Sequence, residues 1–424
     1  MTGALEGVRI VDLCSVVSGP AAIATLADQG ADVVKVEGLT GDITRNGRTA
    51  SPGFSPGFVS CNRGKRSIAL DLKHPDGQAI LWRLLENADV VAQNYRPGVM
   101  ERLGFGYAAV AARNPGIVYL SISGVGPKGP YANKRVYDPT VQALSGLTDI
   151  QADPITGRPK MVRTLVADKT TAIFAAQAVT SALFARSQTG KGQHVEVSML
   201  DVMMSFIWPE GMAPFSVVEE DRLEALATAH DMIFETSDGY VTFGAVSDRE
   251  WAGLCTALDR PDLIADERFV TQAMRSANRQ ERMETVEAAL GVHSSDSIIA
   301  RLEANDVPCM KVMSRREALD DPQVIFNGIV VEIDQPGLGR LRQARPAALF
   351  SETPSHSPRS APALGQHTRD ILTEAGFEEM EIAAFIDRGV VGAVAKSKWQ
   401  LRPPLAALLQ AEHRVHAVKV VPGS

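Results

Sequence analysis

The first half of the chain alternates between short apolar runs and stretches whose apolar residues recur at helical spacing. Residues 8–13 and 31–37 predict buried strands, and the small-residue segment 21–29 before Gly30 predicts the helix between them. The same alternation predicts strands at 67–72, 89–94, 117–121 and 192–198, and helices at 75–87, 168–187 and 199–212. Because strands that are apolar on both faces need helices on both sides, the pattern predicts a parallel, doubly wound, Rossmann-like sheet of the α/β class.

A smaller α+β domain is expected where this alternation stops. Asp238-Gly239 within residues 232–245 is a strong hairpin signal, and the charged segment from Arg275 to Arg282 is expected to be mobile. Helices are predicted at 249–258, 295–305, 367–375 and 378–388, renewed strands at 327–350, and a Pro/Ser-rich linker at 353–362. The predicted organisation is a large domain at 1–215, completed by 326–390, a small domain at 225–325, and a basic tail at 391–424.

Composition and charge narrow the classes of partner. The 424 residues are 45% hydrophobic and carry a net charge of −7, so an acidic surface argues against nucleic acid. No apolar run approaches the roughly 20 residues of a membrane span, and the N-terminus lacks the features of a targeting peptide. The four cysteines lie far apart, which predicts neither a metal site nor a disulfide scaffold, and a cytoplasmic location is expected.

Basic residues nevertheless gather next to the predicted strands. They are Arg45, Arg63, Lys65, Arg66, Lys73, Arg96, Arg102 and Arg135. Open α/β sheets bind ligands beyond the carboxyl ends of their strands, where Lys73 and Arg96 lie, so a ligand with several phosphates is expected there. Each of these charges taken alone is also compatible with a solvated loop. The G-x-G-x-x-G segment at 124–129 contains Pro127 and opens no helix, so it predicts a turn rather than a dinucleotide site.

Asp168 is the acidic residue whose position best suits catalysis. It directly precedes an apolar helix, so one interpretation is a helix N-cap. The other is a nucleophile, because a helix N-terminus keeps a carboxylate ionised and able to attack a thioester carbonyl. Position alone does not separate the two. Asp12, Glu37 and Asp201 fit less well because they fall within strands or a helix, and no nucleophile elbow of a serine hydrolase is present.

A series of motifs extends over most of the chain. They are Leu5-x-Gly7-Val8-Arg9-Ile10-x-Asp12-Leu13, Ser18-Gly19-Pro20, Leu26-Ala27-Asp28-x-Gly30-Ala31-Asp32-Val33-x-Lys35-Val36-Glu37, Gly41-Asp42-x-x-Arg45, Asn62-Arg63-x-Lys65-Arg66-Ser67, Asn94-Tyr95-Arg96-Pro97-Gly98, Gly129-Pro130-Tyr131, Tyr137-Asp138, Gln142-Ala143-x-Ser145-Gly146 and Thr189-Gly190-Lys191-Gly192-Gln193. Together they resemble the class III CoA-transferases, which include formyl-CoA and carnitine CoA-transferases.

This resemblance implies an acyl-CoA:carboxylate CoA-transferase with Asp168 as its nucleophile. The carboxylate would form a mixed anhydride and then an aspartyl-CoA thioester, so neither metal nor nucleotide hydrolysis would be needed. The partners would be an acyl-CoA, a carboxylic acid and a second copy of the chain in an interlocked homodimer. The implied CoA contacts are Val17, Lys73, Asn94, Tyr95, Arg96, Arg102 and Arg135, with Tyr137 and Asp138 near the reacting group.

Three departures from the family pattern bear on the details. Gly38 stands where some members have a CoA-binding arginine, and no glycine-rich lid precedes Asp238, which argues against oxalate as acceptor. Tyr137 stands where related racemases have histidine, which makes an acyl-CoA racemase or isomerase the weaker alternative.

A non-catalytic CoA-binding protein, in which Asp168 only caps its helix, is the third hypothesis. The sequence does not indicate which acyl donor and acceptor acid are used.

Overall fold

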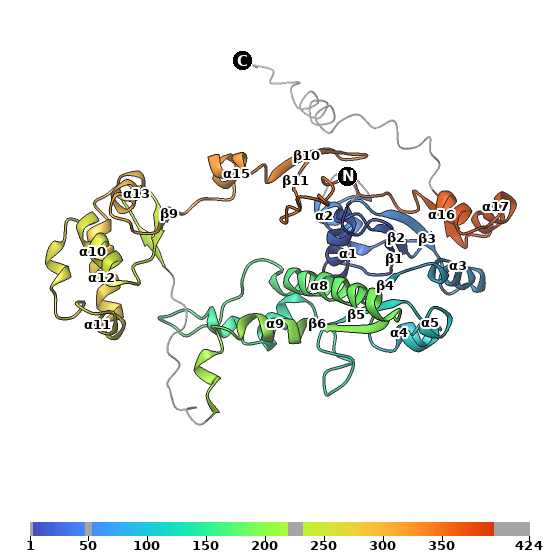
Figure 1. Cartoon of the computed structure of the whole chain (residues 1–424), viewed down its shortest axis with the longest axis horizontal. Coiled ribbons are helices and arrows are strands. Elements are labelled where there is room, and N and C mark those ends of the chain that lie inside the picture. Colours follow the sequence, from blue (N-terminus) through green and yellow to red (C-terminus); the bar gives the residue numbers. More distant parts are fainter. Residues whose placement is uncertain (1–2, 47–52, 219–231, 394–424) are drawn as a thin grey trace, which may run out of the picture. The chain divides into compact units, whose positions relative to one another are not determined.

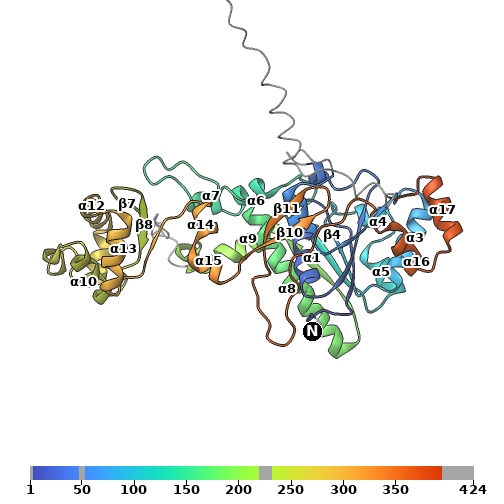
Figure 2. The same cartoon turned by 90° about the horizontal axis from the view of Figure 1, so that it is seen from above.

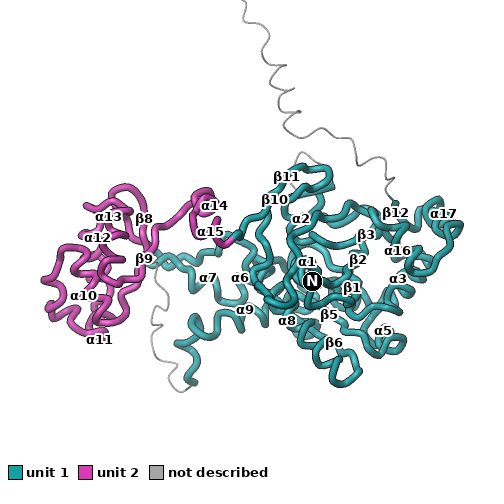
Figure 3. Tube along the Cα trace, turned by 45° about the horizontal axis from the view of Figure 1, so that its top comes forward, with its two compact units in different colours: residues 1–224, 328–424 teal, residues 225–327 magenta. Residues whose placement is uncertain are grey.

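The computed structural model describes residues 3–46, 53–218 and 232–393. Contacts divide the chain into two compact units, residues 1–224 with 328–424 and residues 225–327 (Figure 3). The first unit is therefore formed by both ends of the chain, and the second is an insertion in its sequence. In the part of the chain that is described, no helix is both long and apolar enough to cross a membrane.

The first unit centres on a seven-stranded sheet with the order β12-β3-β2-β1-β4-β5-β6 (Figure 1). Its strands are β1 (Arg9–Asp12), β2 (Asp32–Glu37), β3 (Arg66–Leu70), β4 (Val90–Gln93), β5 (Val118–Ser123), β6 (Gln193–Ser198) and β12 (Val391–Gly392). β1 to β6 are mutually parallel, and only β12 joins antiparallel, pairing Val391 with Leu70. The strand order changes direction at β1, so the loops after β1 and β4 leave the same edge side by side. The predicted α/β fold with a mostly parallel sheet is confirmed.

Helices cover both faces of this sheet (Figure 2). Ile10 packs into a core with α1 and α8, whereas its neighbour Val11 packs into the opposite core with α3, α16 and α17. These helices are α1 (Ser18–Asp28), α8 (Val166–Thr189), α3 (Pro75–Glu86), α16 (Thr368–Glu374) and α17 (Glu379–Asp387). Successive strand residues enter different cores, which explains why β1, β3 and β4 carry apolar residues at consecutive positions.

Three helices have a boundary that lies two or more residues from its predicted position. α8 begins at Val166 with Leu165 as its N-cap, so the interpretation of Asp168 as an N-cap is wrong. α1 begins at Ser18 because Pro20 lies in its first turn, where a backbone N–H has no helical partner to lose. α9 (Met199–Ile207) ends before the predicted residue 212, where Pro209 has no backbone N–H to continue the helical hydrogen bonds.

The second unit contains a three-stranded antiparallel sheet with the order β7-β8-β9 and the helices that pack on it. Its elements are β7 (Ile233–Glu235), β8 (Tyr240–Phe243), α10 (Asp248–Ala257), a 3₁₀ turn (Pro261–Ile264), α11 (Gln272–Ala277), α12 (Arg279–Leu290), α13 (Ser295–Ala304), β9 (Cys309–Lys311), α14 (Glu317–Asp320) and α15 (Pro322–Phe326). The hairpin at Asp238-Gly239 is confirmed. Residues 275–282, which were expected to be mobile, lie in α11 and α12 apart from Asn278, with Arg275 buried against Asp248 and the Phe269 carbonyl.

The remaining elements complete the first unit. They are a 3₁₀ turn (Ile43–Asn46), α2 (Pro56–Asn62), α4 (Val99–Arg102), α5 (Tyr107–Arg113), α6 (Asp138–Leu144), α7 (Leu147–Ile150), a second 3₁₀ turn (Ala213–Phe215), β10 (Val330–Gln335) and β11 (Gly339–Ala344). β10 and β11 form an antiparallel pair. Val391 and Gly392, at the start of the basic tail expected from the sequence, form β12, and residues 394–424 of that tail lie outside the described residues.

Candidate active site

Asp168 lies in the first turn of α8, close to the first turn of α1. The N–H and the hydroxyl group of Ser18, the first residue of α1, both donate hydrogen bonds to the Asp168 carboxyl. Gly19 permits the close approach of α1 to the end of β1, because a Cβ there would lie 2.5 Å from Cys14 Sγ. The carboxyl therefore lies at the N-terminal ends of two helices, where the helix dipoles favour negative charge.

A second carboxyl lies directly behind Asp168. Asp138, the first residue of α6, is 1% exposed, and its Oδ2 accepts the backbone N–H of Asp168 at 3.0 Å. Gln142 donates to the other oxygen of Asp138 at 2.6 Å. Burial raises the pKa of the Asp168 carboxyl, the negative charge of Asp138 raises it further, and the hydrogen bonds from Ser18 oppose both. Asp168 is thus a more basic, and hence more nucleophilic, carboxylate than an exposed aspartate.

Asp168 forms part of the wall of a cavity of about 320 Å³. The cavity lies beyond the carboxyl ends of β1, β4 and β5, which is where open parallel sheets bind ligands. The lining residues are Ser15, Val16, Ser18, Asn94, Tyr95, Arg96, Pro97, Ile122, Ser123, Gly124, Val125, Gly126, Ala132, Lys134, Arg135, Val136, Tyr137, Asp168 and Met199. Six residues singled out in the sequence are brought together here: Asn94, Tyr95, Arg96, Arg135, Tyr137 and Asp168.

The other four candidates do not line this cavity. Val17 is the N-cap of α1, between two residues that do line it, and Asp138 is buried beneath Asp168. Lys73 is exposed after β3, and Arg102 ends α4, with a guanidinium nitrogen 3.1 Å from the position a Cβ would take at Gly98. Asn94 lines the cavity, but its side chain bonds both the N–H and the carbonyl of Ser15, each at 2.8 Å. Asn94 therefore fixes the loop after β1 as well as facing the cavity.

The cavity is positively charged apart from Asp168. Arg96, Lys134 and Arg135 line it, and no carboxylate of the residues resolved here forms an ion pair with any of the three. Lys134 lies 4.2 Å from the centroid of the Tyr131 ring. Ser15, Ser18 and Lys134 were not among the predicted site residues. The place of Ser18 before Gly19-Pro20, at the start of a helix that follows a parallel strand, was a signal that could have found it.

Four basic residues that the sequence places near the strands are not available to a ligand. Arg45 is paired with Glu37 at 2.6 Å, Lys65 with Asp12 at 2.8 Å, Arg63 with Asp28 at 2.6 Å and Arg66 with Asp32 at 2.7 Å. Three of these pairs join residues 34 to 53 positions apart, so local sequence did not reveal them, whereas Arg45 and Glu37 are only eight residues apart. Ion pairs within the protein therefore account for these four residues, none of which is among the implied CoA contacts.

The glycine-rich segment after β5 is part of the cavity wall. Gly124, Val125 and Gly126 line it in a loop that opens no helix, which confirms the predicted turn. A Cβ at Gly124 would lie 1.7 Å from a methyl carbon of Val136, so only glycine fits. Over residues 3–46, 53–218 and 232–393, no group of three or more His, Cys, Asp or Glu side chains could hold a metal ion.

Comparison with known proteins places the sequence in one family. The family model described as CoA-transferase family III matches residues 5–368. The human succinyl-CoA:glutarate CoA-transferase is 33% identical over 398 residues, which cover 91% of this chain and 90% of that protein. The succinyl-CoA:mesaconate CoA-transferase of Haloarcula hispanica is 34% identical over 390 residues, covering 88% and 97%.

Two solved structures are similar to this chain in both fold and sequence. The crystal structure of Rv3272 from Mycobacterium tuberculosis matches with a TM-score of 0.78 and 29% identity, covering 87% of this chain and 99% of that one. A CaiB/BaiF family protein from Brucella suis matches with a TM-score of 0.77 and 30% identity, covering 88% and 100%.

Proposed function

The chain belongs to CoA-transferase family III, and we propose that it moves CoA from an acyl-CoA thioester to a carboxylic acid through a covalent intermediate on Asp168. Members of the family use CoA thioesters as substrates, and the chain is an enzyme of this kind. The observation that carries the proposal is the position of the Asp168 carboxyl. It lies at the starts of two helices and forms part of a cavity wall that also presents three cationic side chains.

In the first step, one carboxylate oxygen of Asp168 attacks the thioester carbonyl carbon. The C–S bond breaks, the sulfur leaves as the CoA thiolate, and a mixed anhydride joins the donor acyl group to Asp168. The raised pKa of Asp168 supports this step, because a more basic carboxylate gives more electron density to the new C–O bond. The two hydrogen bonds from Ser18 orient the side chain.

In the second step, the thiolate attacks the aspartyl carbonyl of the anhydride and releases the donor acid. This leaves CoA as a thioester on Asp168. The acceptor carboxylate then attacks that thioester to give a second mixed anhydride and the thiolate, which attacks the acceptor acyl carbon and restores the Asp168 carboxylate. Each thioester broken is replaced by another, so the cycle needs no metal and no nucleotide hydrolysis.

We assign the binding of CoA to the cationic wall and the strand-end loops. Arg96, Arg135 and Lys134 would neutralise its phosphates, with Tyr95 and Asn94 along the same wall and Val17 next to it, between Val16 and Ser18. Tyr137 and Asp138 would lie beside the reacting thioester. The strand order β3-β2-β1-β4-β5-β6 supports a Rossmann-like description of the first unit. Lys73 and Arg102 lie outside the cavity, so they are assigned to the outer part of CoA, and the enzyme is expected to act as a cytoplasmic homodimer.

Four- and five-carbon dicarboxylates are the first substrates to test. The relatives at 33–34% identity are named for succinyl-CoA with glutarate or mesaconate. A second carboxylate on the acyl group could pair with a cation of the cavity wall that CoA leaves free. The purified protein would be incubated with succinyl-CoA and isotope-labelled glutarate, and labelled glutaryl-CoA measured by mass spectrometry.

Trapping would test the covalent step separately from the choice of acceptor. Hydroxylamine added after succinyl-CoA should convert Asp168 into a hydroxamate, which peptide mass spectrometry detects. The control is the same treatment without the acyl-CoA. Turnover without any modification of Asp168 would contradict the mechanism. Deuterium exchange next to the thioester in the absence of an acceptor acid would instead support the racemase or isomerase alternative.

A further inference from the structure

The loop between β1 and α1 contains a residue in an unusual backbone conformation. Val16 has a φ of 70°, in the left-handed region that glycine adopts freely and β-branched residues rarely do. Such a conformation persists only where surrounding contacts enforce it, and it is found more often at functional sites. Val16 lines the cavity between Ser15 and Ser18. The contacts that hold this loop therefore bear on the shape of the site.

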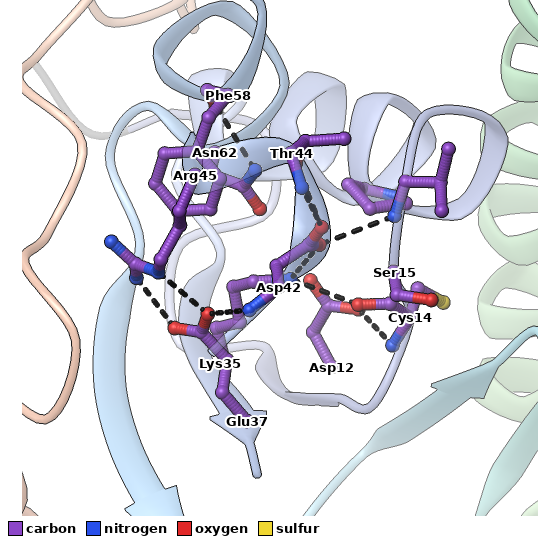
Figure 4. A network of polar contacts seen from close by, with 12 residues as sticks. Asp12, Cys14, Ser15, Lys35, Glu37, Asp42, Thr44, Arg45, Phe58 and Asn62 are labelled. Carbon is purple, nitrogen blue, oxygen red and sulfur yellow. Dashed lines mark hydrogen bonds and ion pairs between the residues drawn. The ribbon is translucent and has the colours of Figure 1, made fainter. Parts of the chain in front are cut away.

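Buried charged side chains make those contacts (Figure 4). The Val16 N–H donates to Asp42 Oδ2 at 3.2 Å, and the same oxygen lies 3.4 Å from Lys35 Nζ. Lys35 also donates to the Cys14 carbonyl at 2.8 Å, and the Cys14 N–H donates to Asp12 Oδ1 at 2.9 Å. Backbone groups of Cys14 and Val16 are thus bonded to charged side chains, and those of Ser15 between them to Asn94.

A second ion pair holds the start of α1. Lys65 Nζ donates to Asp12 Oδ2 at 2.8 Å, to the Pro20 carbonyl at 2.9 Å and to Asn62 Oδ1 at 3.0 Å. The side chains of Lys35, Asp12 and Lys65 are 0% exposed, and that of Asp42 is 1% exposed. We call these four residues the buried charge network. They reach the loop and the helix start from four separate segments of the chain.

Opposite charges stabilise the ionised forms of Asp12 and Lys35, whereas burial, with a contribution from Lys35, holds the pKa of Lys65 below its ordinary value. Burial disfavours the Asp12 carboxylate, but the ammonium groups of Lys65 and Lys35 hold the pKa of Asp12 below its ordinary value. Burial also disfavours the Lys35 ammonium, yet Asp12, Glu37 and Asp42 keep the pKa of Lys35 above its ordinary value. Asp42 is fixed in turn, because its N–H donates to Glu37 and its Oδ1 accepts two hydrogen bonds from Thr44.

We propose that the buried charge network is a positioning device that holds Val16 in its left-handed conformation, so that Ser15 to Ser18 form the cavity wall and Ser18 reaches the Asp168 carboxyl. The inference rests on the proposed function, since it assigns to these residues the shaping of a CoA-transferase site. It makes Asp42 a positioning residue, because its side chain touches the loop and not the cavity. Its effect on catalysis passes through Val16 and Ser18.

Asp42→Asn is the most direct variant. One carboxylate oxygen of Asp42 accepts from Val16 and the other from Thr44. An asparagine amide has only one oxygen, so in either orientation it loses the hydrogen bonds to one of these two residues. We expect the peptide containing residues 13–17 to exchange its amide hydrogens about tenfold faster, measured by mass spectrometry on the whole protein. The dissociation constant of CoA, measured by calorimetry, should rise by about tenfold, the size of effect that strain at one residue can produce.

A double-mutant cycle separates positioning from general destabilisation. Glycine adopts the left-handed conformation without strain, so Asp42→Asn should have a smaller effect, below about threefold, in the Val16→Gly background. The matched control is Asp28→Asn, which breaks another buried pair at the opposite end of α1, with Arg63 at 2.6 Å. This control should lower the thermal midpoint without changing exchange in residues 13–17.

The outcomes distinguish this inference from the proposed function. Equal effects of Asp42→Asn in the Val16 and Val16→Gly backgrounds would overturn the positioning role. So would unchanged loop exchange in Asp42→Asn, or equal loop exchange in Asp42→Asn and Asp28→Asn. A wild-type protein that transfers no CoA would overturn the proposed function instead, and the exchange measurements would still decide the role of the network.

Discussion

Charges on the two sides of the loop between β1 and α1 are arranged in opposite ways. On one side, the buried charge network places each carboxylate within 3.4 Å of an ammonium group. On the other side, Arg96, Lys134 and Arg135 line a cavity without a carboxylate partner in the parts of the chain described, and Asp168 has a second carboxyl, Asp138, as its neighbour. Paired charges fix the backbone, whereas the unpaired ones remain available to a ligand. Substitutions on the two sides should therefore differ in kind.

The largest expected effect is on catalysis, at the unpaired carboxylate. Asp168→Asn keeps the size of the side chain but removes the nucleophile, so CoA transfer should fall by about 10⁴-fold or more. The affinity for CoA should stay within about threefold, because the cationic wall is unchanged. Initial rates with succinyl-CoA and calorimetry with CoA would measure the two quantities.

Asp201→Asn is the matched control for this loss. Asp201 lies in α9, is exposed and was considered among the competing acids of the sequence. Its substitution should leave the rate of transfer within about twofold. Retained turnover in Asp168→Asn would remove the basis of the comparison, because Asp168 would then be another structural acid.

The next largest effect should be on stability, at the paired charges. Lys65→Met leaves Asp12 buried beside one ammonium group instead of two, so the free energy of unfolding should fall by about 3–5 kcal/mol. Lys160→Met breaks a pair of similar length, 2.7 Å to Asp153, but on the surface, and should change the thermal midpoint little. Urea and thermal unfolding would measure both variants. Equal losses would show that burial of the pair is unimportant.

The sequence predicted the fold better than it predicted the use of the charges. Strands such as β3 and β4 each contain a run of three apolar residues, and short apolar runs separated by amphipathic segments specify a parallel sheet covered on both faces. The turn of the hairpin between β7 and β8 likewise depends on two adjacent residues, Asp238 and Gly239. These features depend on neighbouring residues, which is why they could be recognised in one sequence.

Partners of buried charges depend on contacts between distant segments. Lys65 and Asp12 are 53 residues apart, and nothing next to Lys65 distinguishes it from Lys73, which is exposed. The position of Asp168 within its helix was also hard to predict. α8 begins two residues earlier, at Val166, and the residue before it is Leu165, which gives no polar N-cap signal in the sequence. Asp168 was proposed as the nucleophile from the resemblance to the family, and the structure added Ser18 and the pairing of the basic residues.

The pH dependence of catalysis offers a finer test at the unpaired site. Asp168 must be ionised to attack, and its folded-state pKa is raised by burial and by Asp138, so kcat/KM should fall with decreasing pH earlier than for an ordinary aspartate. Asp138→Asn removes a like charge and should move this acid limb to lower pH. Ser18→Ala removes a donor and should move it to higher pH. Shifts in the same direction in both variants would contradict the assigned environment.

The smallest expected effect is on the free energy of unfolding at Asp168. Its substitution should raise this free energy, whereas substitutions at the paired charges lower it. Because the pKa of Asp168 is higher in the folded state, its ionisation opposes folding above the ordinary aspartate range and ceases to do so as the pH falls below that range. Asp168→Asn, which keeps one oxygen to accept from Ser18, should therefore raise the free energy of unfolding at pH 7 by about 1 kcal/mol or less. Asp12→Asn removes a paired carboxylate and should lower it. Thermal unfolding of both variants at pH 7 and at mildly acidic pH would compare them, and the gain in Asp168→Asn should shrink with acidification. A loss of stability in Asp168→Asn would mean that its carboxylate supports the fold as the paired ones do.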